Sequence, residues 1–194
     1  MKKLISLCSM MVIALTMSGC FLMTPTGINS EQQQTFAKET TDSTLKELYK
    51  WQPEAKKVVD NSKGYVVYNI YTFDVFFLGV DTGWAIAYNK KTGEYSYLKD
   101  LSFAVGPALG IANMRNVFVF DNEIEFNSFL ANGWNANLKA DAVARFSEDG
   151  TWDVAGGVNI TNGATYYKIG RRGLIAEAMF DVGKTSTNHS LTTK

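Results

Sequence analysis

Acid–base catalysis is the first chemistry that the side chains of this 194-residue chain could carry out. The candidate carboxylates are scattered along the sequence: Asp74, Asp81, Glu123, Glu125, Asp141 and Asp153. Glycoside hydrolysis needs two such groups to face each other at about 5 to 9.5 Å. The sequence does not show whether any two of these carboxylates lie at that distance. We interpret these residues as solvent-facing carboxylates or helix caps, and a catalytic pair remains the alternative.

The single histidine, His189, argues against both nucleophilic catalysis and a zinc centre. A Ser-His-Asp or Cys-His arrangement would have to draw its base from a polar C-terminal segment, and a zinc site would lack its usual ligands. The glycines follow no phosphate-binding pattern and suit strand bends and bulges: Gly79, Gly83, Gly106, Gly110, Gly156 and Gly157. We therefore predict no catalytic residue, no metal site and no cofactor, and a protein that is not an enzyme.

Cys20 carries the one covalent modification that the sequence predicts. Lys2 and Lys3 precede an apolar run of twelve residues from Leu4 to Leu15, and Met17-Ser18-Gly19 lead into the cysteine. This order is typical of a secretory signal peptide, and the apolar run is shorter than the roughly 20 residues of a membrane-spanning helix. Small residues directly before a cysteine resemble the lipobox of bacterial lipoproteins, although Met17 stands where Leu is preferred.

The lipobox resemblance implies cleavage of the chain after Gly19 and attachment of lipid to Cys20. Two or more acyl chains hold a protein stably on a membrane, whereas one gives only marginal binding. Phe21 follows the cysteine, in place of the Asp that commonly retains lipoproteins in the inner membrane. We expect a lipid-anchored protein of the bacterial cell envelope, in the outer membrane and facing the periplasm. An incidental cysteine beside an ordinary cleavage site is the alternative.

Composition restricts the partners and the source of stability of the mature chain. Without residues 1–19, 17 basic and 19 acidic side chains remain, which gives a net charge of −2. A nearly neutral chain is not expected to bind nucleic acid. With Cys8 removed and Cys20 acylated, no disulfide or cysteine metal site is left. Stability must then come from an apolar core, for which 175 residues suffice.

Polar and turn-forming residues divide the chain into four regions. Residues 1–19 are the predicted signal peptide, and residues 20–34 are a predicted acylated tether that reaches at most about 50 Å when extended. Residues 35–184 are predicted to form a single domain. Residues 185–194 are rich in Ser, Thr and Asn. They are a predicted disordered tail, because they bury too little apolar surface to become ordered.

Helices are expected first in the domain, and strands follow. One helix is expected at Thr35–Lys50 with a capping box of Thr44 and Glu47, and a second at Glu54–Lys63, ended by Gly64. Short runs of aromatic and β-branched residues then predict strands at Tyr65–Tyr71, Val75–Val80, Gly83–Tyr88, Glu94–Leu98, Phe103–Ile111 and Val117–Phe120. Lys90–Gly93 is expected to be a hairpin turn.

A third helix is expected after the first strands, capped by Asp121 or Asn122 and ended by Gly133. Further strands are expected at Trp134–Phe146, Thr151–Ile160, Thr165–Ile169 and Leu174–Gly183, with a turn at Ser147–Gly150. These elements predict an α+β fold that is predominantly antiparallel β. We expect a barrel-like or strongly curved sheet with a few packed helices.

Four motifs stand in order along the mature chain. They are AKKVVDNSKGYVV at Ala55–Val67, GPALG at Gly106–Gly110, VFVFDNEIEFNSF at Val117–Phe129 and YKIGRRGLIAEAMFDVG at Tyr167–Gly183. Over about Glu54–Lys184 the chain resembles the SYLF domain, a lipid-binding family that also occurs in bacterial lipoproteins. The resemblance implies a lipid or membrane surface as the partner. Where the family has alternating glycines, this chain has bulky aromatic residues within Thr72–Gly83, so we do not transfer a particular lipid.

Basic residues are the candidate lipid contacts. Lys168, Arg171 and Arg172 are expected at a tight turn, and each basic residue near an anionic surface contributes about 1 kcal/mol. We predict that these three contact lipid headgroups, and charged turns that serve only solubility are the alternative. Overall, we expect an envelope lipoprotein that binds membrane lipids, anionic lipids included, without catalysing a reaction. The alternative function is a structural or assembly factor that binds another envelope protein.

Overall fold

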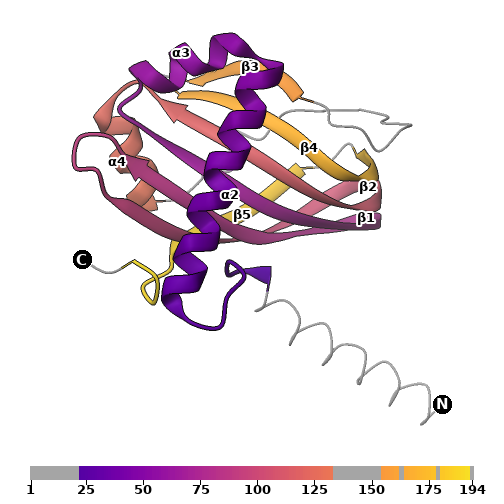
Figure 1. Ribbon diagram of the computed structural model, residues 1–194. Helices are drawn as coiled ribbons and strands as arrows, with labels where there is room; N and C mark the ends of the chain where they lie inside the picture. The colour runs from indigo at the N-terminus through magenta and orange to yellow at the C-terminus, as the bar shows by residue number, and fades with distance from the viewer. Residues whose placement is uncertain (1–21, 133–153, 162–163, 178–179, 193–194) are drawn as a thin grey trace, which may run out of the picture.

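The computed structural model describes residues 22–132, 154–161, 164–177 and 180–192, and their fold is a strongly curved antiparallel sheet with helices packed on both faces (Figure 1). The expected α+β class with a mainly antiparallel sheet is therefore confirmed. Over the described residues the sheet is open and does not close into a barrel.

Two helices begin the described part of the chain: α2 at Ser30–Trp51 and α3 at Pro53–Asn61. The side chain of Asn29 caps α2 by accepting a hydrogen bond from the Gln32 N–H at 2.9 Å. α2 thus begins inside the expected tether, and Pro25 before it is buried. Both expected helices are confirmed, but the expected end at Gly64 is wrong, because α3 ends at Asn61 with Ser62 as its cap. The chain also packs on the domain earlier than the sequence suggests.

The expected capping box at Thr44 is wrong, because this residue lies in the interior of α2 and its hydroxyl donates to the Thr40 carbonyl at 2.7 Å. Thr44 faces the sheet instead. Its hydroxyl oxygen accepts a hydrogen bond from Nη1 of the buried Arg115 at 2.9 Å, and the same nitrogen lies 3.1 Å from Oγ of Ser43. Since a buried cation is costly unless it is hydrogen-bonded, these contacts help to fix α2 over the sheet.

Two long strands form the centre of the sheet: β1 at Gly64–Asn89 and β2 at Tyr95–Phe120. They pair antiparallel along almost their whole length. The six short strands expected between Tyr65 and Phe120 are segments of these two. The hairpin turn expected at Lys90–Gly93 is confirmed, with the Gly93 N–H donating to the Asn89 carbonyl at 2.8 Å and Gly93 at φ 74°.

β1 folds back on itself, so that its two halves lie against each other. A Cβ atom at Gly83 would overlap the carbonyl oxygen of Asn69, and the Lys90 N–H donates to the Lys63 carbonyl at 3.1 Å. Only glycine fits position 83 because the backbone approaches so closely. The fold-back occurs where the β1–β2 register shifts between Phe76 and Leu78. We call residues 75–78 of β1 and 105–109 of β2 the bend.

The remaining elements are α4 at Glu123–Asn132, β3 at Val154–Thr161, β4 at Ala164–Glu177 and β5 at Phe180–Thr187. β4 pairs with the second half of β2 and β5 with its first half, which gives the order β1-β2-β4-β3 with β5 also on β2. The cap of α4 is Asn122, whose Oδ1 accepts from the Glu125 N–H at 2.8 Å. The strand and turn expected between residues 134 and 150 lie outside the described residues.

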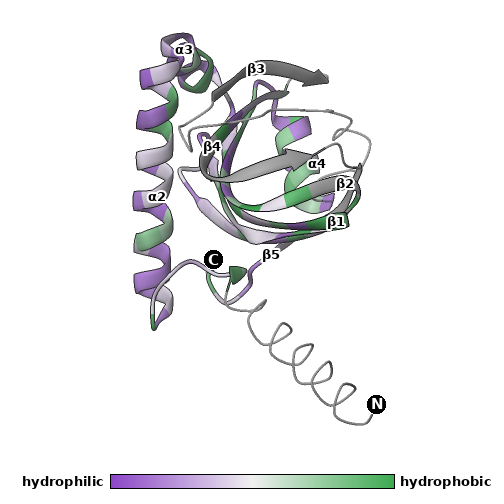
Figure 2. Cartoon of the chain, turned by 90° about the vertical axis from the view of Figure 1, so that its right-hand side faces the viewer, coloured by the Kyte–Doolittle hydropathy of each residue, from purple (hydrophilic) through white to green (hydrophobic). Residues whose placement is uncertain are grey.

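Apolar layers cover both faces of the sheet away from the bend (Figure 2). On the outer face, which carries α2 and α3, the core contains Val67, Trp84, Ile86, Val117 and Ile169, packed against Ala37, Leu45 and Leu48. On the inner face, which carries α4, it contains Val66, Tyr68, Phe118 and Phe120, packed against Phe126 and Phe129. Alternate residues of β1 thus enter opposite layers.

The C-terminal segment is part of the fold. The expected disordered tail is wrong for residues 185–192, because β5 continues to Thr187 and Leu191 is buried at 1% exposure. The Asn188 N–H donates to the Tyr97 carbonyl at 2.7 Å, and Gln34 of α2 donates to the Leu191 carbonyl at 2.7 Å. One buried leucine and paired backbone groups order a segment whose composition is otherwise polar.

We predict that Leu191→Ala lowers the free energy of unfolding by about 2–5 kcal/mol, because it leaves a cavity in the outer layer. Urea denaturation of the purified protein would measure the change. His189→Ala, at an exposed neighbouring position, is the control and should stay within about 0.5 kcal/mol of the parent. Equal stability of the two variants would contradict the structural role of the C-terminal segment.

We also predict alkaline destabilisation from buried tyrosines. Burial raises the pKa of Tyr49 and of Tyr97 to about 12, whereas a tyrosine in an unfolded chain titrates near 10. The unfolded state therefore loses these protons first, so the stability that is complete below pH 10 should fall as the pH rises from 10 to 12. Tyr97→Phe should make this decline shallower in urea titrations at pH 9, 10 and 11. An unchanged slope would contradict the assignment.

Candidate functional site

The residues predicted from the sequence as lipid contacts do not form a turn. Cys20 and Gly19 lie outside the described residues. Lys168 is half-buried in β4, where it pairs with Asn116 and Ala155, and Arg172 pairs with Asn113 further along the same strand. A register shift beside Asn113 accommodates Arg171. The expected tight turn is therefore wrong, since all three basic residues belong to one continuous strand.

The carboxylates expected to face solvent include two that are buried. Asp74 and Asp81 lie on the inner face of β1 near the bend. The Thr72 hydroxyl donates to Oδ1 of Asp81 at 2.5 Å. Glu123 does face solvent, where it lies 2.9 Å from Nζ of Lys91. The interpretation as surface carboxylates thus holds for Glu123 and is wrong for the two aspartates.

A hydrogen-bonded network lies beside them on the inner face. The Thr185 hydroxyl donates to Oδ1 of Asp100 at 2.6 Å, and Thr185 Oγ1 lies 3.0 Å from the Tyr68 hydroxyl. Burial, followed by the charge of Asp100, raises the pKa of Tyr68 well above its usual value. Within the described ranges, no three His, Cys, Asp or Glu side chains gather closely enough to hold a metal ion. The inner face near the bend is therefore polar and internally hydrogen-bonded.

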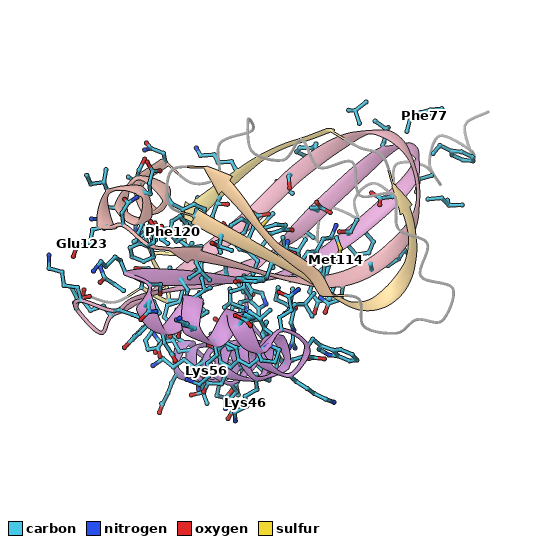
Figure 3. All side chains as sticks on the ribbon, turned by 90° about the horizontal axis from the view of Figure 1, so that it is seen from above. Lys46, Lys56, Phe77, Met114, Phe120 and Glu123 are labelled. Atoms are coloured by element: carbon cyan, nitrogen blue, oxygen red, sulfur yellow. The ribbon has the colours of Figure 1, made fainter. Side chains whose placement is uncertain are left out.

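The outer face near the bend has the opposite character. Nine apolar side chains at the bend itself and on the outer face beside it are between 37% and 73% exposed: Phe73, Val75, Phe76, Phe77, Leu78, Phe103, Val105, Leu109 and Ile111. We call these nine residues the apolar rim. Phe77 lies at the end of the sheet remote from the helices, and its side chain points away from the domain (Figure 3). Neither α2 nor α3 covers this part of the sheet.

Polarity is inverted along the strands that form the rim. In β1, Thr72 and Asp74 are buried, whereas the alternate residues Phe73 and Val75 are exposed. In β2, buried Ser102 is followed by exposed Phe103. A sheet face in water normally carries polar side chains outward, and large contiguous apolar patches generally mark interaction surfaces. The rim therefore has the properties of a surface that is covered when the protein functions.

Phe76 adds backbone strain to this exposure. Among the described residues that are not glycine, it alone has a positive φ, at 58°. A left-handed conformation costs a residue with a Cβ atom roughly 1–2 kcal/mol, and Phe76 is 73% exposed, so packing within the domain returns little of this cost. Strain of this kind points from geometry to function.

The sequence contains one part of the signal for the rim. No charged residue occurs from Val75 to Val80 or from Leu101 to Met114. These runs predict strands correctly, but sequence alternation could not show which of the two faces is exposed. In the described part of the chain, no helix has both the length and the apolar composition that crossing a membrane requires.

A comparison with known proteins identifies a relative of this chain. No family model matches the chain. Over 154 residues, or 78% of its length, the chain is 32% identical to Beta cell expansion factor A of Aeromonas veronii. The matched region makes up 56% of that protein, so the chain spans little more than half the length of this relative. The chain is thus similar to a part of Beta cell expansion factor A.

Proposed function

We propose that this protein is a lipid-anchored protein of the bacterial envelope whose domain binds the phospholipid bilayer through the apolar rim. It does so without catalysing a reaction. The observation that carries the proposal is the inverted polarity at the bend, where apolar side chains face outward and polar ones are buried. The resemblance to the SYLF domain supports a lipid partner, and the lipobox-like sequence before Cys20 supports the anchor.

The rim is sufficient in size for interfacial binding. Transfer of a fully exposed Val, Leu or Phe side chain out of water contributes about 1.5–3 kcal/mol. The rim residues begin roughly half exposed, so each contributes on the order of 1 kcal/mol when the acyl region covers it. Apolar faces that bind membranes reach about 5–10 Å into the interface, which the side chains around Phe77 can do without unfolding of the sheet.

The acyl anchor and the rim have separate roles in this proposal. Lipid on Cys20 holds the chain on the outer membrane, facing the periplasm, whereas the rim decides whether the domain lies on that membrane. Another envelope protein could also cover the rim, as the alternative function requires. Vesicles of pure lipid separate the two possibilities, because they contain no protein partner.

We predict that the mature chain carrying Cys20→Ser, and hence no acyl anchor, floats with neutral phosphatidylcholine vesicles even at 0.5 M salt, where the screening length for surface charges is only about 4 Å. Adding Phe77→Ser and Leu78→Ser should weaken vesicle binding at least tenfold. Ile124→Ser is the matched control, because Ile124 is 80% exposed on α4 outside the rim, and it should float like the parent. Equal flotation of rim and control variants would refute the proposal. If the parent chain bound no vesicles, the protein-partner alternative would take its place.

We further predict that Phe76→Gly separates stability from binding. Glycine relieves roughly 1–2 kcal/mol of left-handed strain and loses about 0.4–1 kcal/mol through greater freedom of the unfolded chain. The variant should therefore be more stable in urea by about 0.5–1 kcal/mol and yet bind vesicles more weakly. Phe77→Gly is the control, since its backbone is not left-handed, and it should gain no stability. A Phe76→Gly variant that binds as well as the parent would show that this ring is not used.

A further inference from the structure

The apolar rim has a basic border on the arm of the sheet formed by β2 and β5. On the outer face, residues of β2 alternate outward from the bend as Val105, Phe103, Leu101 and Lys99. Lys184 of β5 lies opposite Leu101 in the β2–β5 register. Going away from the bend along this arm, the aliphatic residues on the outer face of β2 thus end at Leu101, with Lys184 beside it and Lys99 at the next outer position.

The carboxylates of this arm face the other way. Asp81 and Asp100 are buried on the inner face, with threonine hydroxyls donating to both. The Lys184 side chain is exposed and that of Lys99 is half-buried. Long cationic side chains can lie along apolar surface with their charged ends at its edge. The outer face therefore passes from apolar to cationic without an intervening carboxylate of β1 or β2.

The second arm ends differently. Leu109 and Ile111 pair with Val75 and Phe73 on β1, and the next outer position of β2 is Asn113. Beyond it, Arg115 is covered by α2 and hydrogen-bonds to Ser43 and Thr44. Among the side chains that the structure describes, the cations at the edge of the rim that no helix covers are thus Lys99 and Lys184 of the β2–β5 arm.

The length of the arm matches the depth of a bilayer interface. Val105 and Leu101 are four positions apart in the sequence, which corresponds to roughly 13 Å along a strand at about 3.3 Å per residue. A strand that is inclined to the membrane normal spans a depth smaller than its length. The depth spanned by this arm is then comparable to the 5–10 Å to which apolar faces insert at the interface. When the bend lies at the acyl boundary, Lys99 and Lys184 therefore reach the level of the lipid phosphates.

We propose that Lys99 and Lys184 bind phosphate groups of the bilayer and set the depth to which the apolar rim inserts. This inference rests on the proposed function, because the lysines reach phosphates only if the rim is in the bilayer. It replaces β4 with the β2–β5 border as the place where headgroups are bound. The rim provides binding that is independent of lipid charge, and the two lysines add a preference for anionic membranes.

The affinity test uses the mature chain with Cys20→Ser and vesicles of phosphatidylcholine, with or without 30% phosphatidylglycerol. Each lysine near an anionic surface contributes about 1 kcal/mol, or about fivefold. Lys99→Gln with Lys184→Gln should therefore weaken binding to the anionic vesicles by up to about 25-fold at 50 mM salt, with little change on neutral vesicles or at 0.5 M salt. Lys57→Gln on α3, exposed and away from the rim, is the control. Equal binding by the double variant and this control would overturn the inference.

A second measurement tests depth directly. The chain with Cys20→Ser has no cysteine in the mature region, so a fluorophore can be attached to a single new cysteine at Leu78 or at Ser186. The Leu78→Cys probe should be quenched by lipids brominated on their acyl chains. The Ser186→Cys probe, beyond Lys184 on β5, should not. Quenching at both positions would overturn the lysine border and leave the rim intact, whereas quenching at neither would contradict the proposed function itself.

Discussion

The close contact between the two halves of β1 is the constraint on which the rest of the structure depends. Because the backbone at Gly83 lies directly against the Asn69 carbonyl, the strand can fold back without a loop. β2 follows the same path because it pairs with β1 on both sides of the bend, and β4 and β5 follow β2. One contact that excludes a side chain thus determines the curvature of all these strands.

The bend also divides the sheet into a covered and an uncovered part. Away from the bend, α2 and α4 bury apolar residues on the two faces of the sheet, as helices do in other α+β domains. Near it, the helices end and the outer face is exposed, while the inner face carries Asp81, Asp100 and their threonine partners. The stability of the domain therefore comes from one end of the sheet, which leaves the other end free to carry exposed apolar groups and the strained Phe76.

Local sequence patterns predicted the elements of this fold well, and long-range contacts less well. Periodicity gave the helices, the strand segments and the hairpin turn, because these depend on neighbouring residues. The fold-back could not be predicted, since it depends on Gly83 meeting Asn69, fourteen residues earlier. Residues 185–192 are ordered because one leucine, Leu191, is buried. An average over the composition of the segment does not show the effect of a single residue. The rim required knowledge of which face α2 covers, so the sequence suggested basic residues of β4 instead.

The contact between α2 and the C-terminal residues joins the two ends of the described chain. Ser30 donates to the Ser190 carbonyl at 3.4 Å and Gln34 to that of Leu191, so the first helix and the segment after the last strand meet at one place (Figure 1). The described chain therefore begins and ends at the same place in the fold. Its first and last elements share one boundary, and a local opening there exposes both, so that protease access at either end reports on the same event.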